Sequence, residues 1–361
     1  MVFLLSVVCF TGLTMSLATL LVLAARVLVN YGTCKLDINA GEKPLEVQGG
    51  QSVLAALYAN EIFIPSACGG KGSCGHCKVT ITAGGGPVLP TELSYLTRTE
   101  IRSNVRLACQ VKIREDVFIK IPSDLLNVRM FDATIERADT LTHDIKEIRM
   151  RLDEPVEIIQ RPGQYVQIQA PSPDGPVFRA YSISSPAYDR GAVELMVRLV
   201  PGGIGSTYLH TIKPGDRVNF TGPYGEFWLN EDPATEIVCV GGGCGMAPMK
   251  NIIYTLYERW PQRTCWLFFG CRGKRDVFYL EQFQELSKKH PNLRVIYALS
   301  EANGEDWSGE TGFIHLAVDK HLEAGVARQA FLCGPPLMID AVTQVLTAKG
   351  LRPEDIFYDK F

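Results

Sequence analysis

The sequence predicts a multidomain protein with an N-terminal transmembrane helix, a small α+β domain, an antiparallel β-barrel domain and an α/β domain built on a doubly wound parallel sheet. Three observations predict this arrangement. The chain begins with a long uncharged run, its middle consists of short strands separated by turns, and its last third alternates strand-like and helix-like segments. We place the boundaries at residues 1–30, 31–127, 128–230 and 231–361.

The N-terminal segment has no charged residue from Val2 to Ala25. A helix of these 24 residues is about 36 Å long at 1.5 Å per residue, enough to cross about 30 Å of hydrocarbon. A signal peptide or a buried helix are the alternatives, but a signal peptide would have a basic start and a shorter apolar core. Because Arg26 and Lys35 follow the run, we expect a single-pass anchor with the remaining domains on the cytoplasmic side.

The overall charge excludes one class of partner. The 361 residues include 36 basic and 39 acidic ones, for a net charge of −3. Nucleic-acid binding requires a surplus of Lys and Arg to neutralise phosphates, so we expect no nucleic-acid partner. The 11 cysteines are odd in number and partly clustered, which favours a metal site over a disulfide framework.

The α+β domain is predicted from local patterns. Residues 34–48 have a strand–turn–strand pattern, and residues 78–82 alternate as a strand. Between them Ser52 is placed as the N-cap of a short helix at 53–60.

The two following domains are predicted from the order of their elements. Short strands divided by turns indicate an antiparallel barrel or sandwich, with strands expected at 144–152, 164–170, 180–184, 193–200 and 216–222. Alternating elements then indicate a parallel sheet, with strands at 236–242, 265–270, 293–300 and 330–334 and helices at 249–260, 279–290 and 336–350.

The cysteine cluster consists of Cys68, Cys74 and Cys77 in a glycine-rich loop, followed by Cys109. Four thiolates hold a [2Fe–2S] cluster, two on each iron, and glycines allow backbone amides to approach the sulfurs. A structural zinc site is the alternative, although zinc sites more often have two paired CxxC motifs. His76 lies within the loop, where we expect a solvent-facing spacer because four cysteines are available.

A candidate flavin site begins with Arg179, Tyr181 and Ser182. Arg binds a diphosphate, Tyr offers a stacking face, and Ser can hydrogen-bond the edge of a flavin ring. A glycine-rich turn then precedes two residues that can cap a helix, and a helix N-terminus binds phosphate. This second element comprises Gly202, Gly203, Gly205, Ser206 and Thr207. A plain glycine turn with a capped helix is the alternative.

A candidate nucleotide site lies at the carboxyl ends of strands in the last domain. One glycine turn follows the first strand, at Gly242, Gly243, Gly245 and Met246, and a second loop holds Cys333, Gly334 and Pro335. Doubly wound sheets bind nucleotides at this edge. The turn lacks the GxGxxG pattern, so it predicts a nucleotide less specifically, and a buried core cysteine is the alternative for Cys333.

Together these motifs resemble the ferredoxin–NADP reductase superfamily preceded by a plant-type ferredoxin domain of the β-grasp type. The RxYS, GGIGS, GPYGEF, GGGCGMAP and CGPP motifs occur in the expected order. The arrangement is similar to the F subunits of Na⁺-translocating NADH:quinone oxidoreductases in three features. These are the N-terminal apolar segment, the five-residue first gap of the cluster loop, and the GGGPVLPTEL sequence before Cys109.

The resemblance implies an NADH dehydrogenase subunit in the bacterial inner membrane. It implies FAD and a [2Fe–2S] cluster as cofactors and NADH as substrate. Its partners would be other membrane subunits and, indirectly, ubiquinone, with sodium translocation by the complex. A flavin is suited to lie between NADH and the [2Fe–2S] cluster, because it exchanges two electrons with NADH and single electrons with a cluster.

The resemblance also assigns roles around the reacting rings. Cys333 would lie near the nicotinamide, Tyr165 and Tyr181 beside the flavin ring, and Phe361 over its other face, although a frayed terminus is the alternative for Phe361. Glu301 follows a predicted strand, and an acid there would favour NADH over NADPH.

Two other functions remain open from the sequence. The reductase component of a bacterial oxygenase would share the same modules but would be soluble, so the uncharged N-terminal run disfavours it. An anchored electron carrier or scaffold without activity would bind no flavin and oxidise no NADH.

Overall fold

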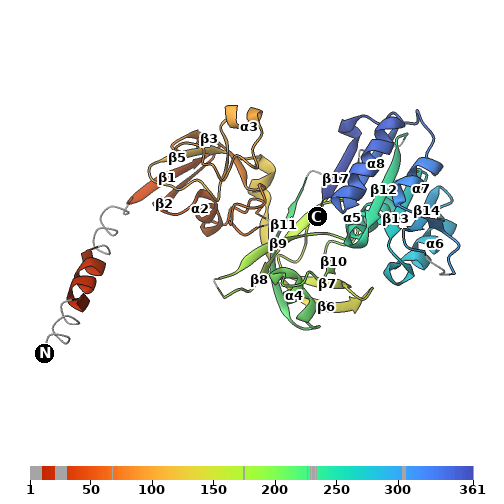
Figure 1. Ribbon diagram of the computed structural model, residues 1–361, viewed down its shortest axis with the longest axis horizontal. Helices are drawn as coiled ribbons and strands as arrows, with labels where there is room; N and C mark the ends of the chain where they lie inside the picture. Colours follow the sequence, from red (N-terminus) through yellow and green to blue (C-terminus); the bar gives the residue numbers. More distant parts are fainter. Residues whose placement is uncertain are drawn as a thin grey trace. The chain divides into compact units, whose positions relative to one another are not determined.

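A computed structural model describes residues 10–20, 31–66, 68–173, 175–225, 227, 229, 232, 234–302 and 306–360 (Figure 1). The chain divides into two compact units, Met1–Val128 and Arg129–Phe361. Each unit is described by itself.

The N-terminal segment is described only in part. Residues 10–20 form an α-helix with exposed side chains. Across the described ranges, no helix combines the length and the apolar character that crossing a membrane requires. The other parts of the uncharged run, residues 2–9 and 21–25, lie outside the described residues.

The first unit contains a mixed five-stranded sheet of order β2-β1-β5-β3-β4. Its strands are β1 (Thr33–Ile38), β2 (Lys43–Gln48), β3 (Lys78–Ala83), β4 (Val105–Leu107) and β5 (Val117–Lys120), and its helices are α2 (Val53–Ala59), α3 (Arg98–Arg102) and the 3₁₀ turn η1 (Ser123–Asn127). As predicted, Ser52 caps α2, since its hydroxyl accepts a 3.1 Å hydrogen bond from the Ala55 amide. The cysteine-rich loop lies between α2 and β3.

The second unit begins with a six-stranded antiparallel sheet of order β10-β7-β6-β11-β8-β9. Its strands are β6 (Arg129–Thr140), β7 (Ile145–Glu154), β8 (Tyr165–Ala170), β9 (Val177–Ser182), β10 (Ala192–Arg198) and β11 (Arg217–Tyr224), with α4 (Ile204–Thr211) between the last two. Ile183, just after β9, bridges to Leu195 in β10. This bridge closes the sheet into a barrel, which agrees with the predicted architecture.

The second unit continues with a parallel six-stranded sheet of order β15-β14-β13-β12-β16-β17. Its strands are β12 (Glu236–Gly242), β13 (Cys265–Cys271), β14 (Leu293–Leu299), β15 (Glu310–Thr311), β16 (Arg328–Gly334) and β17 (Ile356–Lys360). Its helices are α5 (Met246–Arg259), α6 (Leu280–Lys289), α7 (Ile314–His321) and α8 (Pro336–Ala348), with 3₁₀ turns η2 (Gly243–Gly245), η3 (Lys274–Asp276) and η4 (Pro353–Asp355).

Helices cover both faces of this sheet (Figure 1). Along β12, Cys239 packs with α5 and α6 on one face, while Val238 and Val240 pack with α7 and α8 on the other. Successive strand residues point to opposite faces, so a continuous apolar run serves two cores. The strand order reverses between β12 and β16, which places a ligand-binding crevice at the carboxyl ends of these two strands.

Several elements of the second unit were not predicted from the sequence. In β6, only Phe131, Ala133 and Ile135 are buried, so its apolar pattern is short for a strand of 12 residues. The helix α7 has eight residues, the strand β15 has only two, and β17 has a single buried residue.

Candidate functional site

The four predicted cluster cysteines lie in two pairs. Cys68 and Cys74 are within hydrogen-bonding contact of each other, and so are Cys77 and Cys109. None of the four forms a disulfide. Within the described ranges, no three His, Cys, Asp or Glu side chains come together so that they would hold one metal ion. Two pairs of cysteines fit two irons with two thiolates each.

Backbone amides stabilise the first pair of cysteines. Burial acts to raise the pKa of Cys68, but hydrogen bonds from the Ser73 backbone and from Cys74 outweigh it and lower that pKa. Burial raises the pKa of Cys74. Thiolate is the form that binds iron, so amides directed at these sulfurs suit a negatively charged cluster.

The second pair behaves in the same way. The hydrogen bond from Cys77 is the largest cause that lowers the pKa of Cys109 to about 6, and the Gln110 side chain and the Gly72 backbone contribute. The same contact with Cys109, together with burial, raises the pKa of Cys77. Cys109 is therefore the sulfur of this pair that ionises first.

Glycines shape the loop that carries the first three cysteines. Gly72 has φ +72°, and a Cβ there would lie 2.6 Å from Gln110 Nε2. Gly75 also has φ +72°, and a Cβ there would lie 2.9 Å from Tyr95 Cβ. The loop therefore needs both the left-handed conformation and the absence of side chains. The side chain of His76 is exposed, as expected for a spacer.

The predicted flavin residues come together at one end of the barrel. In the pairing of β8 with β9, Tyr165 lies opposite Ser182. The ring of Tyr165 stacks on buried Tyr224 of β11, with centroids 5.5 Å apart. Burial raises the pKa of Tyr181, which keeps its hydroxyl neutral. Three strands thus place aromatic rings and a hydroxyl where a planar ring system would bind.

The glycine turn before α4 adjoins the same residues. A Cβ at Gly205 would lie 2.7 Å from both Arg179 Cγ and Tyr181 Oη. Gly205 therefore allows the N-terminus of α4 to approach Arg179. The backbone amides of the helix and the arginine together suit the binding of a diphosphate.

The expected capping role of Ser206 and Thr207 is wrong. Helix α4 begins earlier, with Gly203 as its N-cap and no side chain capping it. Ser206 lies inside the first turn, and its Oγ instead accepts a 3.1 Å hydrogen bond from the Val200 amide. Gly202 has φ +72°, which the turn requires. Without a side-chain cap, the first amides of α4 are better suited to an anion.

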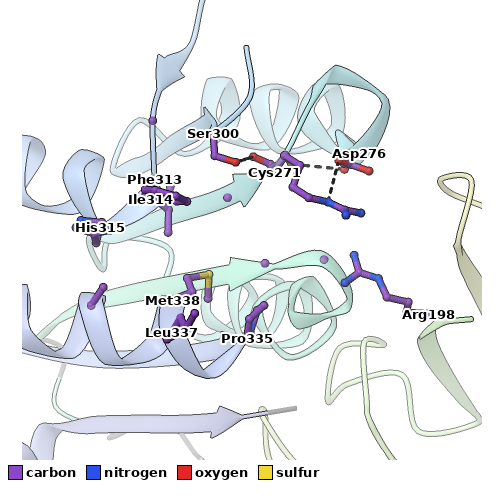
Figure 2. A pocket seen from close by; sticks show the side chains of 16 residues that line it. Arg198, Cys271, Asp276, Ser300, Phe313, Ile314, His315, Pro335, Leu337 and Met338 are labelled. Atoms are coloured by element: carbon purple, nitrogen blue, oxygen red, sulfur yellow. Dashed lines mark hydrogen bonds and ion pairs between the residues drawn. The ribbon is translucent and has the colours of Figure 1, made fainter. Parts of the chain in front are cut away.

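A cavity of about 420 Å³ opens at the carboxyl edge of the parallel sheet (Figure 2). Its lining includes Gly242 at the end of β12 and Gly243 after it, Cys271 at the end of β13, Ser300 after β14 and Pro335 after β16. Carboxyl ends of parallel strands lie at one edge of a sheet, so segments far apart in the sequence meet here. The size suits part of a dinucleotide.

The glycine turn after β12 is packed tightly. A Cβ at Gly242 would lie 2.9 Å from Met338 Sδ, and one at Gly243 would collide with the guanidinium of Arg198. One at Gly245 would collide with the carbonyl oxygen of Cys333. Met246 begins α5, whose N-cap is Gly245 with no capping side chain. The turn therefore presents bare backbone, which suits close approach to phosphates.

The remaining predicted residues have different outcomes. Cys333 is 1% exposed, and burial raises its pKa well above the usual value. It pairs in register with Asp359 of β17, while Gly334 pairs with Lys360. The terminal Phe361 lies outside the described residues. Glu301 has an exposed side chain and is absent from the described residues that line the cavity, although its neighbour Ser300 is among them.

The sequence interpretation missed two charged residues in the cavity, Arg198 and Asp276. Asp276 Oδ1 is buried and has no hydrogen-bond partner among the described residues. His143 Nδ1 lies 3.7 Å from this oxygen, which is beyond hydrogen-bond distance, so the acceptor fits a hydroxyl donor such as a ribose and supports a nucleotide in this cavity. Arg198 ends a strand three residues before the PGGIGS turn begins at Pro201, and that position was the available signal.

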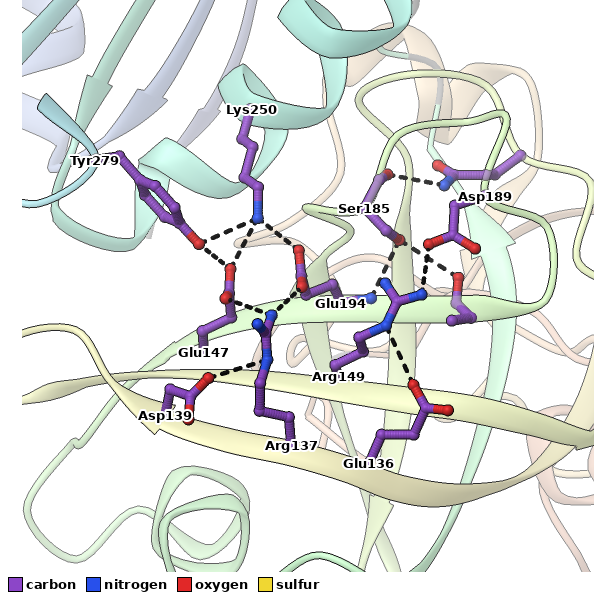
Figure 3. A network of polar contacts seen from close by, with 12 residues as sticks. Glu136, Arg137, Asp139, Glu147, Arg149, Ser185, Asp189, Glu194, Lys250 and Tyr279 are labelled. Carbon is purple, nitrogen blue, oxygen red and sulfur yellow. Dashed lines mark hydrogen bonds and ion pairs between the residues drawn. The ribbon is translucent and has the colours of Figure 1, made fainter. Parts of the chain in front are cut away.

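A charge network with two buried carboxylates connects the barrel to the parallel-sheet domain (Figure 3). Lys250 of α5 lies 2.8 Å from Glu147 of β7 and 2.5 Å from Glu194 of β10. Arg137 of β6 contacts both carboxylates, and the Tyr279 hydroxyl donates to Glu147. Alternating charges compensate one another in the network, so burial leaves none of these groups without a partner.

Fold and site define a class: an NADH-dependent flavoprotein oxidoreductase with its own iron–sulfur domain. Three family models match in this order, a 2Fe-2S iron-sulfur cluster binding domain at 36–114, an oxidoreductase FAD-binding domain at 132–228 and an oxidoreductase NAD-binding domain at 239–344. The chain belongs to the family of F subunits of Na(+)-translocating NADH-quinone reductases. It is 37% identical to the member from Neisseria meningitidis serogroup C, over 99% of this chain and 98% of the relative.

Other relatives agree with this assignment. The F subunit of the Na(+)-translocating NADH-quinone reductase of Klebsiella pneumoniae is 35% identical, with 99% of this chain and 98% of the relative aligned. Among solved structures, the Amycolatopsis cytochrome P450 reductase GcoB is similar with a TM-score of 0.75 and 30% identity, covering 91% of this chain and 99% of its own. The ferredoxin reductase in carbazole 1,9a-dioxygenase has a TM-score of 0.71 and 29% identity, with 91% and 99% covered.

The family and its domains establish the cofactors and the activity. The chain uses FAD, a [2Fe–2S] cluster and NADH, and it has NADH dehydrogenase activity. The predicted ferredoxin-like, FAD-binding and NADH-binding domains and the electron-input function are thereby confirmed.

Proposed function

We propose that this chain is the electron-input subunit of a membrane-bound, quinone-reducing complex. When bound, FAD would supply two-electron exchange with NADH and single-electron exchange with the [2Fe–2S] cluster. Partner subunits would carry the electrons on to ubiquinone, and the complex would couple this transfer to sodium translocation. The names of the relatives support this assignment.

The chain's own residues would bind and orient these groups rather than exchange protons with substrate. We assign the cluster to Cys68, Cys74, Cys77 and Cys109. We assign FAD to Tyr165, Arg179, Tyr181, Ser182 and the turn at Gly202, Gly203, Gly205, Ser206 and Thr207. NADH would contact Gly242, Gly243, Gly245, Met246, Gly334, Pro335 and Glu301, with Cys333 and Phe361 beside the reacting rings.

Arg198 and Asp276 extend the proposed NADH site. The guanidinium of Arg198 lies against Gly243 and would bind the diphosphate, while Asp276 Oδ1 would accept a hydrogen bond from a ribose hydroxyl. A hydride transfer needs alignment of two rings more than it needs a general base, and the tightly packed turn supplies a fixed position.

One observation carries the proposal: the four cysteines form two pairs in a domain separate from the dinucleotide cavity. That division suits a path from a two-electron donor to a one-electron centre. The test is NADH oxidation with ferricyanide as acceptor, using the full chain. Turnover with bound flavin supports the proposal, and a flavin-free protein that oxidises no NADH would make it a carrier or scaffold.

Membrane attachment is a separate part of the proposal. The uncharged run from Val2 to Ala25 would anchor domains 31–127, 128–230 and 231–361 to the cytoplasmic side of the bacterial inner membrane. Fractionation tests it, because an anchored chain stays in the membrane pellet after a high-salt wash.

A soluble oxygenase reductase is the second candidate. The similarity to a cytochrome P450 reductase and to a dioxygenase reductase favours it. Release of the full chain into the soluble fraction by the high-salt wash would support this candidate and contradict the anchored subunit.

A further inference from the structure

The side chain of Gln110 contacts one of the proposed cluster ligands. Its Nε2 donates a hydrogen bond to Cys109 Sγ across 3.5 Å. Among the described contacts to the four sulfurs, the other side-chain donor outside the cysteines is Ser73, which bonds Cys68. Each cysteine pair thus receives one hydrogen bond from a neighbouring side chain, in addition to those from the backbone.

A second contact fixes the orientation of the Gln110 amide. The Thr91 hydroxyl donates a 3.0 Å hydrogen bond to Gln110 Oε1. Because the amide oxygen is taken by a donor, the amide nitrogen is directed to the opposite side, where Cys109 lies. Gly72 leaves the space for this nitrogen, since a Cβ there would lie 2.6 Å from it.

A buried ion pair holds Thr91 in place. Its neighbour Glu92 is fully buried and makes a bidentate contact with Arg106, the shortest distance being 2.6 Å. Glu92 also accepts hydrogen bonds from the amides of Leu89 (2.8 Å) and Leu107 (2.9 Å). The segment that carries Thr91 is therefore anchored to β4, which directly precedes Cys109.

We propose that Gln110, oriented by Thr91, is a positioning residue that raises the reduction potential of the [2Fe–2S] cluster through Cys109. The inference rests on the proposed role of Cys109 as an iron ligand. The reduced cluster carries one more negative charge than the oxidised cluster, so a hydrogen bond to a ligand sulfur stabilises the reduced form more.

The test is a redox titration of the full chain followed by EPR, with iron and sulfide measured in every sample. Gln110→Leu keeps a similar volume but cannot donate, so we expect a cluster with a more negative midpoint potential. Thr91→Val removes the orienting hydroxyl without changing the shape, and we expect a smaller shift in the same direction. Thr91→Ser keeps the hydroxyl, so we expect this variant to have the wild-type midpoint potential.

Thr82→Val is the matched control. The hydroxyl of Thr82 donates to the Phe118 carbonyl at 3.1 Å, and four strand residues of about 3.3 Å each lie between Thr82 and Cys77. The midpoint potential of the cluster in Thr82→Val should equal that of the wild type. An equal shift in this variant would contradict a specific role for Thr91.

The outcomes separate the inference from the proposed function. A wild-type chain that contains no iron or sulfide contradicts the proposed ligands themselves. A Gln110→Leu variant with a full cluster and an unchanged potential overturns the inference alone. If Gln110→Leu assembles no cluster, the inference is tested by comparing the cluster potentials of Thr91→Val and Thr91→Ser. Equal potentials in these two variants overturn the inference.

Discussion

The carbonyl oxygen of Cys333 occupies the space that a side chain at Gly245 would need. Gly245 belongs to the turn after β12, and Cys333 lies near the end of β16, the neighbouring strand at which the strand order reverses. The two loops proposed to bind NADH therefore lie against each other, and displacement of one would displace the other.

A Gly245→Ala variant tests this contact. The added methyl group must push the turn away from Cys333, and a misplacement of about 1 Å can lower the rate about 100-fold. We expect a loss of that order in kcat/KM for NADH, measured as stopped-flow flavin reduction. Gly191→Ala is the control, because nothing lies within 4 Å of an added Cβ there. Equal rates in the two variants would contradict the assigned role of the turn.

A Cys74→Ala variant tests whether the cluster and the flavin work as separate modules. We expect it to lose the visible and EPR signals of the cluster but to keep NADH-dependent flavin reduction, since the cysteine pairs belong to the first compact unit. Cys34→Ala is the control, because Cys34 is buried in the same domain but its thiol donates to the Tyr31 carbonyl and is not one of the proposed ligands. Loss of flavin reduction in a folded Cys74→Ala variant would show that the modules are not independent.

An Arg179→Ala variant tests the flavin cradle. Arg179 lies beside Gly205 through Cβ and Cγ, and loss of its guanidinium removes the proposed diphosphate contact, so we expect FAD to be released during purification. The measurement is the ratio of flavin to protein. Arg151→Ala is the control, since Arg151 is largely exposed and pairs with Asp153 at 2.8 Å on the barrel. Full retention of FAD by Arg179→Ala would refute the assignment.

The ion pair of Glu92 and Arg106 should stabilise the first unit. Its side chains are 0% and 4% exposed, and removal of one partner from a buried pair costs about 3–5 kcal/mol. We therefore expect Arg106→Leu to lose its cluster absorbance at a lower urea concentration than the wild type. Arg102→Leu, at the exposed end of α3, should behave like the wild type.

The same pair predicts a pH dependence. Burial acts to raise the pKa of Glu92, but Arg106 and two backbone amides outweigh it and lower the pKa. Because this pKa is lowered, ionised Glu92 stabilises the folded unit. This stabilisation is fully present above the ordinary glutamate pKa of about 4.3 and is lost as the pH falls through the lower pKa of the folded state. Hydrogen exchange of the Leu107 amide reports it locally. A protection factor of the Leu107 amide that stays constant as the pH falls below about 4.3 would contradict this pH dependence.

Parts of the fold and site could be predicted because local sequence determines them. Ser52 caps its helix through a contact three residues away, and the glycine turns follow strands whose carboxyl ends share one edge of the sheet. The contacts of Gln110 with Thr91 and of Asp276 with the cavity depend on which distant segments meet. Nothing in the local pattern of these residues distinguishes them from surface polar residues.

The capping error has a similar cause. Ser206 has the composition of a cap, but its hydroxyl is used by Val200 in the preceding loop. The helix therefore begins at Ile204 with its first amides available to a ligand. Composition alone could not show which of two backbone groups the hydroxyl would contact.

The central claim is that one chain passes electrons from NADH through FAD to its own [2Fe–2S] cluster. An anaerobic titration of the purified full chain with NADH, followed by visible and EPR spectroscopy, tests it most directly. The account predicts bleaching of the flavin absorbance and the appearance of the EPR signal of a reduced [2Fe–2S] cluster. A flavin that bleaches while the cluster stays oxidised, or a protein whose spectrum NADH does not change, would contradict it.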